Sequence, residues 1–238
     1  SFAAVFPILQ VLGITITNVY PLVAEITILF SAFLSFAMIG LYDDIKKFFG
    51  IKKSRFFGLR MRHKIILQVG AALAVATMMY QWLGINFVNI PFMGQVHLGP
   101  LFIAYATFVI VAFANAVNIT DGLDGLAAGL VAIAVITLGL FAYVAGRVDT
   151  SAYLQLFYLR GAGELAVFCS AVVGACIGFL WYNAHPAQVF MGDTGSLALG
   201  GALGAIAILL KSEFLLLIVG AVFVAETASV ILQRGVFK

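Results

Sequence analysis

The chain has 238 residues, of which 63% are hydrophobic and 10% are charged, and its formal net charge is +3. Ordinary soluble domains carry roughly 25% charged and roughly 45–50% apolar residues, so this composition excludes a soluble enzyme, a disordered tail and a disulfide-stapled secreted domain. A net charge of +3 is also too small to indicate a nucleic-acid partner. The composition therefore predicts an all-α, polytopic transmembrane helix bundle.

Apolar runs long enough to cross a bilayer recur along the whole chain. The hydrocarbon core is ~30 Å thick and takes ~20 residues of helix, with ~17–25 usual. We predict eight spans in residues 1–238, which we treat as one integral membrane domain. In chain order they are Phe2–Ile16, Leu22–Tyr42, Ile65–Leu83, Pro100–Val117, Leu126–Ala145, Glu164–Tyr182, Leu197–Leu210 and Phe214–Leu232.

Small residues within the spans are predicted to pack helices together. Gly174 and Gly178 form one small-xxx-small pair, and Gly200 and Gly204 form another; such pairs let two helices approach closely. Outside the spans, residues 84–99 are predicted to contain a small hairpin.

The distribution of basic residues predicts the orientation of the spans. Eight of the thirteen Lys and Arg residues lie in the loop from Asp43 to Lys64: Lys46, Lys47, Lys52, Lys53, Arg55, Arg60, Arg62 and Lys64. By the positive-inside rule this loop is cytoplasmic. Counting spans onward then places residues 118–125 and 183–196 on the cytoplasmic side as well.

Five of the ten acidic residues fall at this predicted cytoplasmic face: Asp43, Asp44, Asp121, Asp124 and Asp193. Carboxylates at membrane depth usually face a polar cavity or pathway, so their convergence beside a basic loop predicts a functional site. On a helix, Asp44 points ~100° away from Asp43, so the two adjacent acids can serve different partners.

Each acidic motif also has a structural alternative. Asp43 and Lys47 are spaced i,i+4 and could form an ion pair at a helix end. Asp121 and Asp124 could complement the dipole of the following helix, and residues 192–196 (GDTGS) could be a tight turn with a helix cap. His185 fits loop structure and ligand contact equally well.

Several carboxylates with few other nucleophiles indicate a hard cation. Mg²⁺ takes one or two carboxylates and fills its remaining positions with water and substrate phosphate. Glycines beside Asp121, Asp124 and Asp193 allow the backbone N–H groups to approach phosphate oxygens. Together with the nearby lysines and arginines, these features point to phosphoryl transfer, in which catalysis is mainly positioning and charge stabilisation.

Three motifs in the right order resemble the phospho-N-acetylmuramoyl-pentapeptide transferase family, a branch of the polyprenyl-phosphate N-acetylhexosamine-1-phosphate transferases. They are the pair Asp43-Asp44 with Lys47, residues 115–126 (NAVNITDGLDGL) and residues 183–196 (NAHPAQVFMGDTGS). The family architecture has ten helices, and the resemblance implies that the eight spans predicted here are its second to ninth. Family segments with a Met-Gly-Gly motif and a His-His-His loop would precede and follow this chain.

The resemblance implies a multi-pass enzyme of the bacterial inner membrane whose active site faces the cytoplasm. Its reaction would be the Mg²⁺-dependent transfer of phospho-MurNAc-pentapeptide from UDP-MurNAc-pentapeptide to undecaprenyl phosphate, which gives lipid I and UMP in peptidoglycan synthesis. A homodimer surrounded by membrane lipid is implied by the family alone.

The resemblance also implies roles for individual residues. Asp43 would activate the acceptor, with Asp44 beside it, and Asp193 would hold Mg²⁺. Asn183, Phe190 and Asp124 would surround the uridine, with Phe190 stacked on the uracil. Asp121 and Lys47 would contact the nucleotide sugar or its diphosphate. Asn118 is a further predicted substrate-binding residue.

Other functions fit part of the pattern. A different polyprenyl-phosphate hexosamine-1-phosphate transferase would share the motifs. A lipid prenyltransferase would explain Asn118, Asp121 and Asp124 but not the Asp43-Asp44 and Asp193 motifs. A carboxylate-lined transporter tends to bind near the midplane and often has internal repeats, whereas these acids lie at one face and no repeat is visible.

Overall fold

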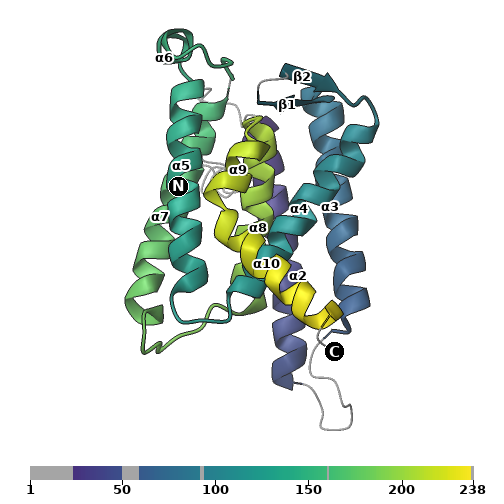
Figure 1. Cartoon of the computed structure of the whole chain (residues 1–238), viewed down its shortest axis with the longest axis vertical. Helices are drawn as coiled ribbons and strands as arrows, with labels where there is room; N and C mark the ends of the chain where they lie inside the picture. Colours follow the sequence, from purple (N-terminus) through teal and green to yellow (C-terminus); the bar gives the residue numbers. More distant parts are fainter. Residues whose placement is uncertain (1–23, 50–58, 92–93, 160, 237–238) are drawn as a thin grey trace, which may run out of the picture.

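The computed structural model describes residues 24–49, 59–91, 94–159 and 161–236, and Figure 1 shows their arrangement. The first predicted span, Phe2–Ile16, lies outside the described residues. Six described helices are long and apolar enough to cross a membrane: α2 (Ala24–Phe49), α3 (Met61–Leu83), α4 (Leu101–Thr120), α5 (Leu126–Ala145), α7 (Ala162–Asn183) and α8 (Gly192–Leu209). The predicted all-α, multi-pass membrane bundle is confirmed.

Shorter elements lie at one end of this bundle (Figure 1). A two-stranded antiparallel hairpin of β1 (Phe87–Ile90) and β2 (Gly94–His97) connects α3 to α4, as predicted for residues 84–99. The six-residue helix α6 (Val148–Tyr153) follows α5 at the same end.

The last predicted span, Phe214–Leu232, is not one straight helix. The structure has a short α9 (Glu213–Val219) and α10 (Ala221–Val236), bent by 75° relative to each other. The bend lies at Gly220, where a Cβ atom would come within 2.7 Å of the carbonyl oxygen of Leu216. The described residues therefore contain six spans, or seven if the bent pair crosses as one.

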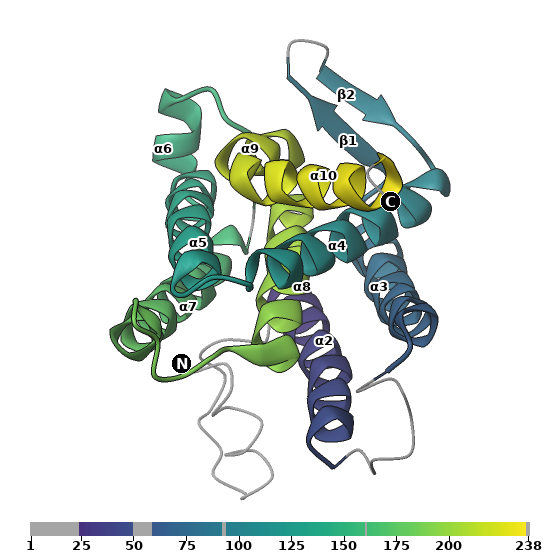
Figure 2. The ribbon, with the colours of Figure 1, turned by 60° about the horizontal axis from the view of Figure 1, so that its bottom comes forward.

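Helix α8 lies at the centre of the bundle, between α2 and α4 (Figure 2). Its residues 196–198 and 200–209 are buried. Glycines make this close packing possible: a Cβ at Gly200 would lie 2.6 Å from the carbonyl oxygen of Phe113 in α4, and one at Gly201 would lie 2.8 Å from the Phe36 ring in α2. Because the α8 backbone meets the α4 backbone at Gly200 and a buried ring of α2 at Gly201, the position of α8 is tightly fixed.

One of the two predicted glycine pairs packs against another helix among the described residues. A Cβ at Gly204 would meet the Ile110 Cα of α4 at 3.0 Å, so the prediction for Gly200 and Gly204 is confirmed. Gly174 and Gly178 face no atom of the described residues within 4 Å of a Cβ position, so the prediction for this pair stays a prediction.

A close approach of backbones also positions the first turn of α8 against α2. A Cβ at Gly40 of α2 would overlap the backbone of Asp193 and Thr194. The carboxyl-terminal part of α2 therefore crosses the first turn of α8 in direct backbone contact. This crossing brings Asp43 and Asp44 next to Asp193.

We predict that Gly200→Ala lowers the thermal unfolding temperature, whereas Gly174→Ala leaves it unchanged or raises it. Both changes replace a helical glycine with a residue that favours helix by about 1 kcal/mol. The added methyl at position 200 overlaps the backbone of α4, and such overpacking costs about 1–3 kcal/mol. Thermal unfolding of both variants in the same detergent measures the difference, and equal shifts would contradict the packing described here.

Candidate active site

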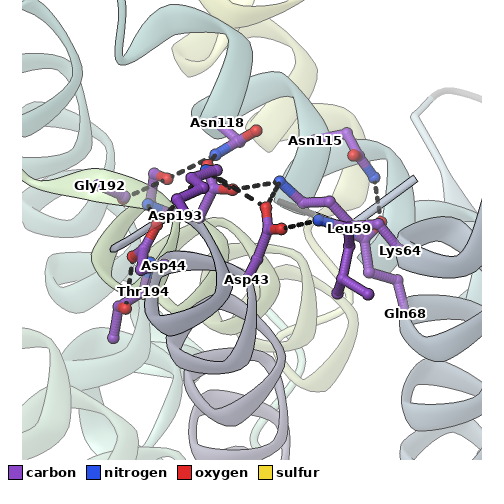
Figure 3. Close-up of polar contacts among 12 residues, drawn as sticks. Asp43, Asp44, Leu59, Lys64, Gln68, Asn115, Asn118, Gly192, Asp193 and Thr194 are labelled. Carbon is purple, nitrogen blue, oxygen red and sulfur yellow. Dashed lines mark hydrogen bonds and ion pairs between the residues drawn. The ribbon is translucent and has the colours of Figure 1, made fainter. Parts of the chain in front are cut away.

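Three carboxylates and two lysines from three helices form one ionic cluster at the end of the bundle (Figure 3). The Lys47 Nζ atom lies 3.2 Å from Asp43 Oδ2 and 3.4 Å from Asp44 Oδ1, and it also contacts Asp193 Oδ2. The Lys64 Nζ atom lies 2.7 Å from Asp193 Oδ2 and 3.4 Å from Asp43 Oδ2. We call these five residues the ionic cluster.

The charges of the ionic cluster do not cancel. Three carboxylates face two ammonium groups, which leaves one negative charge in excess when all five groups are ionised. Asp43 is 3% exposed, and a buried charge that loses its partner destabilises a protein by about 3–5 kcal/mol. The lysines therefore have a structural role as counter-ions, and the excess negative charge favours a further cation.

Asp44 is turned away from Asp43 and caps helix α8 (Figure 3). Its Oδ2 atom accepts hydrogen bonds from the Thr194 backbone N–H at 2.8 Å and from the Thr194 hydroxyl at 2.6 Å, and its Oδ1 atom accepts from the Asp193 N–H at 3.3 Å. The N-terminus of a helix attracts negative charge, and α8 has no side-chain cap at its own N-cap residue, Met191. Asp44 thus fixes the turn that carries Asp193.

Asn118 holds Asp193 from the side of α4. Its amide nitrogen donates to Asp193 Oδ1 at 2.7 Å and to the Ser196 hydroxyl at 2.8 Å. Side chains from α2, α3 and α4 therefore all bind the carboxylate of Asp193, which lies in the first turn of α8. The predicted site residues Asp43, Asp44, Lys47, Asn118 and Asp193 lie together.

The sequence analysis assigned no role to three residues that the structure places at this site. Lys64 is part of the ionic cluster, and one turn further along α3 the Gln68 Oε1 atom accepts a 2.6 Å hydrogen bond from the Asn115 amide of α4. The Leu59 N–H, just before α3, donates to Asp43 Oδ1 at 2.6 Å. Lys64 and Gln68 stand four residues apart in an apolar run, and this spacing of polar groups is the signal that could have identified them.

Asp121 follows the last residue of α4 and lies near the ionic cluster. Burial, together with the negative charges of Asp193 and Asp44, raises the pKa of its carboxyl group from 3.8 to about 6. A carboxyl group with this pKa can bind or release a proton close to neutral pH.

A second group of predicted residues ties two loops together. The Asn183 side chain accepts a 3.0 Å hydrogen bond from the Gly125 N–H and donates to the Val189 carbonyl at 2.8 Å. Asp124 Oδ2 accepts from the Ala187 N–H at 3.2 Å and lies 3.1 Å from His185 Nδ1. Phe190 is 73% exposed, so its ring is available to a ligand, whereas the polar atoms of Asn183 already have partners within the chain.

The oxygen donors of the ionic cluster fit a hard divalent cation. In the described part of the chain no group of three or more His, Cys, Asp or Glu side chains is arranged to hold a metal ion as it stands. The Lys47 ammonium lies among oxygens of Asp43, Asp44 and Asp193, which is the kind of ligand that Mg²⁺ takes from proteins. A positive group thus already lies where the carboxylates would bind a metal.

We predict that Asp44→Ala lowers the unfolding temperature more than Asp121→Ala does. The first change removes three hydrogen bonds at the start of α8, and the loss of a helix cap costs about 0.5–2 kcal/mol. The second change also removes an aspartate at this end of the bundle, but burial disfavours the ionised form of Asp121. Thermal unfolding of both variants without divalent metal tests this, and a larger loss for Asp121→Ala would contradict the capping role.

Asp121 should also make stability depend on pH. Because its pKa is higher in the folded chain than its ordinary value of 3.8, the folded state binds more protons than the unfolded state up to about pH 6. Stability contributed by the protonated form is therefore lost as the pH rises from 3.8 to about 6. In Asp121→Asn this decrease should be smaller, which chemical unfolding in metal-free buffer across that range measures; identical pH profiles would show that Asp121 titrates normally.

Comparison with known proteins shows the family of this sequence. The sequence profile of glycosyl transferase family 4 matches residues 26–211. The phospho-N-acetylmuramoyl-pentapeptide-transferase of Gemmatimonas aurantiaca is 83% identical over 138 residues, which cover 58% of this chain and 36% of that protein. The proteins of the same name from Desulfotalea psychrophila and Thermodesulfovibrio yellowstonii are 54% and 48% identical and cover 86% and 89% of this chain.

The matched parts are 57% and 59% of the length of the last two relatives, so this chain spans less than two thirds of the proteins it resembles. The family profile nevertheless covers most of the chain, including α2 from its third residue, all of α8 and every residue of the ionic cluster. The chain belongs to glycosyl transferase family 4.

Proposed function

We propose that the protein containing this chain transfers phospho-MurNAc-pentapeptide from UDP-MurNAc-pentapeptide to undecaprenyl phosphate, with lipid I and UMP as products. The observation that carries the proposal is the ionic cluster, in which Asp43 and Asp193 share the same two lysines. Carboxylates and ammonium groups at one membrane face suit the binding of a metal-bound diphosphate. The three relatives described above bear the name of this activity.

Asp43 is the proposed activating carboxylate for the acceptor phosphate. It is held by the Leu59 N–H on one oxygen and lies near both lysines on the other, so its position is set by α2 and by the start of α3. The lysines would neutralise phosphate charge as the acceptor oxygen attacks the β-phosphorus of the donor. Asp44 acts through α8, because its oxygens are bonded to the backbone there.

Asp193 is the proposed Mg²⁺ ligand, and Mg²⁺ would supply charge stabilisation at the diphosphate when bound. Asn118 orients the Asp193 carboxylate through its 2.7 Å hydrogen bond. Both residues are positioned by buried helices, and this rigidity suits a group that has to hold a ligand in fixed geometry.

The loop beside the ionic cluster is the proposed uridine site. Phe190 offers an exposed ring for stacking on the uracil. Asp124 lies in the loops that Asn183 joins and accepts a hydrogen bond from the Ala187 N–H, and Asp121 would contact the sugar or diphosphate. In this proposal Asn183 acts mainly by shaping the site.

The proposal includes the setting of the enzyme. Eight basic residues lie in or beside the loop that joins α2 to α3. We place the protein in the bacterial inner membrane, and by the positive-inside rule this end of the bundle faces the cytoplasm. A homodimer surrounded by membrane lipid is proposed from the family resemblance.

The test uses the full-length protein with Asp43→Asn, Asp193→Asn and the control Asp149→Asn, which changes an exposed acid in α6 at the far end of the bundle. We expect the first two changes to reduce UMP release at least about 100-fold, while the control retains wild-type turnover. Near wild-type turnover of Asp43→Asn or Asp193→Asn at saturating Mg²⁺ would refute the role of that residue.

The substrate is tested separately by radiolabel transfer into butanol-extractable lipid. Label from UDP-MurNAc-pentapeptide, and not from UDP-N-acetylglucosamine, should appear in the lipid fraction. The reverse preference would indicate a different hexosamine-1-phosphate transferase, and solute transport into sealed vesicles without any transfer would indicate a transporter.

A further inference from the structure

The two lysines of the ionic cluster differ in how firmly they are held. The Lys64 side chain is 10% exposed, whereas that of Lys47 is 41% exposed. Lys64 lies on α3 beneath the site and contacts Asp43 and Asp193. Lys47 lies in the last turn of α2 and reaches the carboxylates from the solvent side, so its long side chain is free to leave without repacking a helix.

The Lys47 ammonium lies where the carboxylates converge. It is 3.2 Å from Asp43 and 3.4 Å from Asp44, and it is hydrogen-bonded to Asp193. A divalent cation bound by Asp193 in this space would meet the ammonium at close range. Two cations cannot share the same oxygens without strong repulsion, so metal binding requires Lys47 to move.

The charge balance favours this exchange. With Lys47 in place the ionic cluster carries three negative and two positive charges. Replacing the Lys47 ammonium by a divalent cation, while Lys64 stays, gives three negative and three positive charges. The exchange also releases a flexible side chain, which recovers rotamer entropy, and it frees a positive group next to the metal site.

We propose that Lys47 is an internal substitute for the metal, which neutralises the carboxylates in the metal-free protein and is displaced when a divalent cation binds to Asp193. The released ammonium, on its flexible side chain, is then free to pair with the donor diphosphate, whose negative charge offsets its repulsion from the metal. This inference rests on the proposed function, because the metal and the diphosphate belong to it. It assigns to Lys47 a role in controlling metal occupancy in addition to substrate contact.

Mn²⁺ binding to the full-length protein tests the competition directly. Bound and free Mn²⁺ are distinguished by electron paramagnetic resonance, so no turnover is needed. We expect Lys47→Met to bind Mn²⁺ at least about tenfold more tightly than the wild type, within the ~5–150-fold range typical of coupled binding events. Lys47→Arg keeps the charge and should bind like the wild type.

Lys46→Met is the matched control. It removes the same charge from the neighbouring residue, but Lys46 lies over the Tyr42 ring at 4.5 Å and is exposed. At physiological ionic strength exposed charges are screened over ~8 Å, so this change should affect Mn²⁺ affinity much less than Lys47→Met. Equal effects of the two changes would mean that only net charge matters and would overturn the inference.

Thermal unfolding provides a second readout that also shows whether the variants fold. Without metal, Lys47→Met should unfold at a lower temperature than the wild type, because three carboxylates face one lysine. Added Mn²⁺ should raise the unfolding temperature of Lys47→Met more than that of the wild type. Unchanged or weaker Mn²⁺ binding in Lys47→Met would overturn the competition.

The outcomes separate this inference from the proposed function. If the wild type binds Mn²⁺ and Asp193→Asn does not, but Lys47→Met binds no more tightly than the wild type, then the metal site stands and only the competition fails. If the wild type and Lys47→Met both bind no Mn²⁺, the metal site itself fails, and with it both proposals.

Discussion

The need to neutralise carboxylates inside an apolar bundle is the constraint on which the rest of this structure depends. Asp43 is almost fully buried, and Asp193 stands in the first turn of the central helix. Neither has enough water around it to be stable alone, so both require cations from other helices. Lys47 comes from α2 and Lys64 from α3. The carboxylate of Asp193 is therefore neutralised only when these helices pack together at this end of the bundle.

The central helix converts this local requirement into a defined geometry. Glycines let the backbone of α8 touch α4 at Gly200 and let α2 touch the start of α8 at Gly40. Asp44 then closes the first turn of α8 by accepting hydrogen bonds from its backbone. Two adjacent aspartates on α2 thus have different tasks within the ionic cluster: Asp43 lies near both lysines, whereas Asp44 mainly positions the helix that supplies Asp193.

Much of this arrangement follows from sequence pattern, and the exceptions have a common cause. Apolar runs predicted the spanning helices, and the angle between neighbouring residues on a helix predicted different partners for Asp43 and Asp44. Spacing alone does not show which way a helix faces: the Gly174 and Gly200 pairs have the same spacing, and among the described residues only Gly200 faces a neighbour. The break at Gly220 likewise lies in an apolar run that hydropathy cannot distinguish from a straight helix.

In the candidate site, too, some residues could be predicted from sequence pattern and others depend on how the helices pack. The acids were visible because acidic residues are rare in this chain. Lys64 was one of eight basic residues in or beside a charged loop, so its spacing from Gln68 was the signal for it, and its spacing from Asp43 was not. Gln68 and Asn115 lie 47 positions apart and meet only because α3 packs on α4. Contacts of this kind require the tertiary structure.

The burial of α8 has a consequence for how the protein responds to its membrane. Bilayers of different thickness act on helices that touch lipid, by changing their tilt. Helix α8 is buried along most of its length, and glycines bring its backbone against α4 at Gly200 and against the α2 backbone at Gly40. Helix α8 itself is therefore shielded from changes in acyl-chain length, whereas α2 and α3, which supply the two lysines, are the more exposed helices on which bilayer thickness acts.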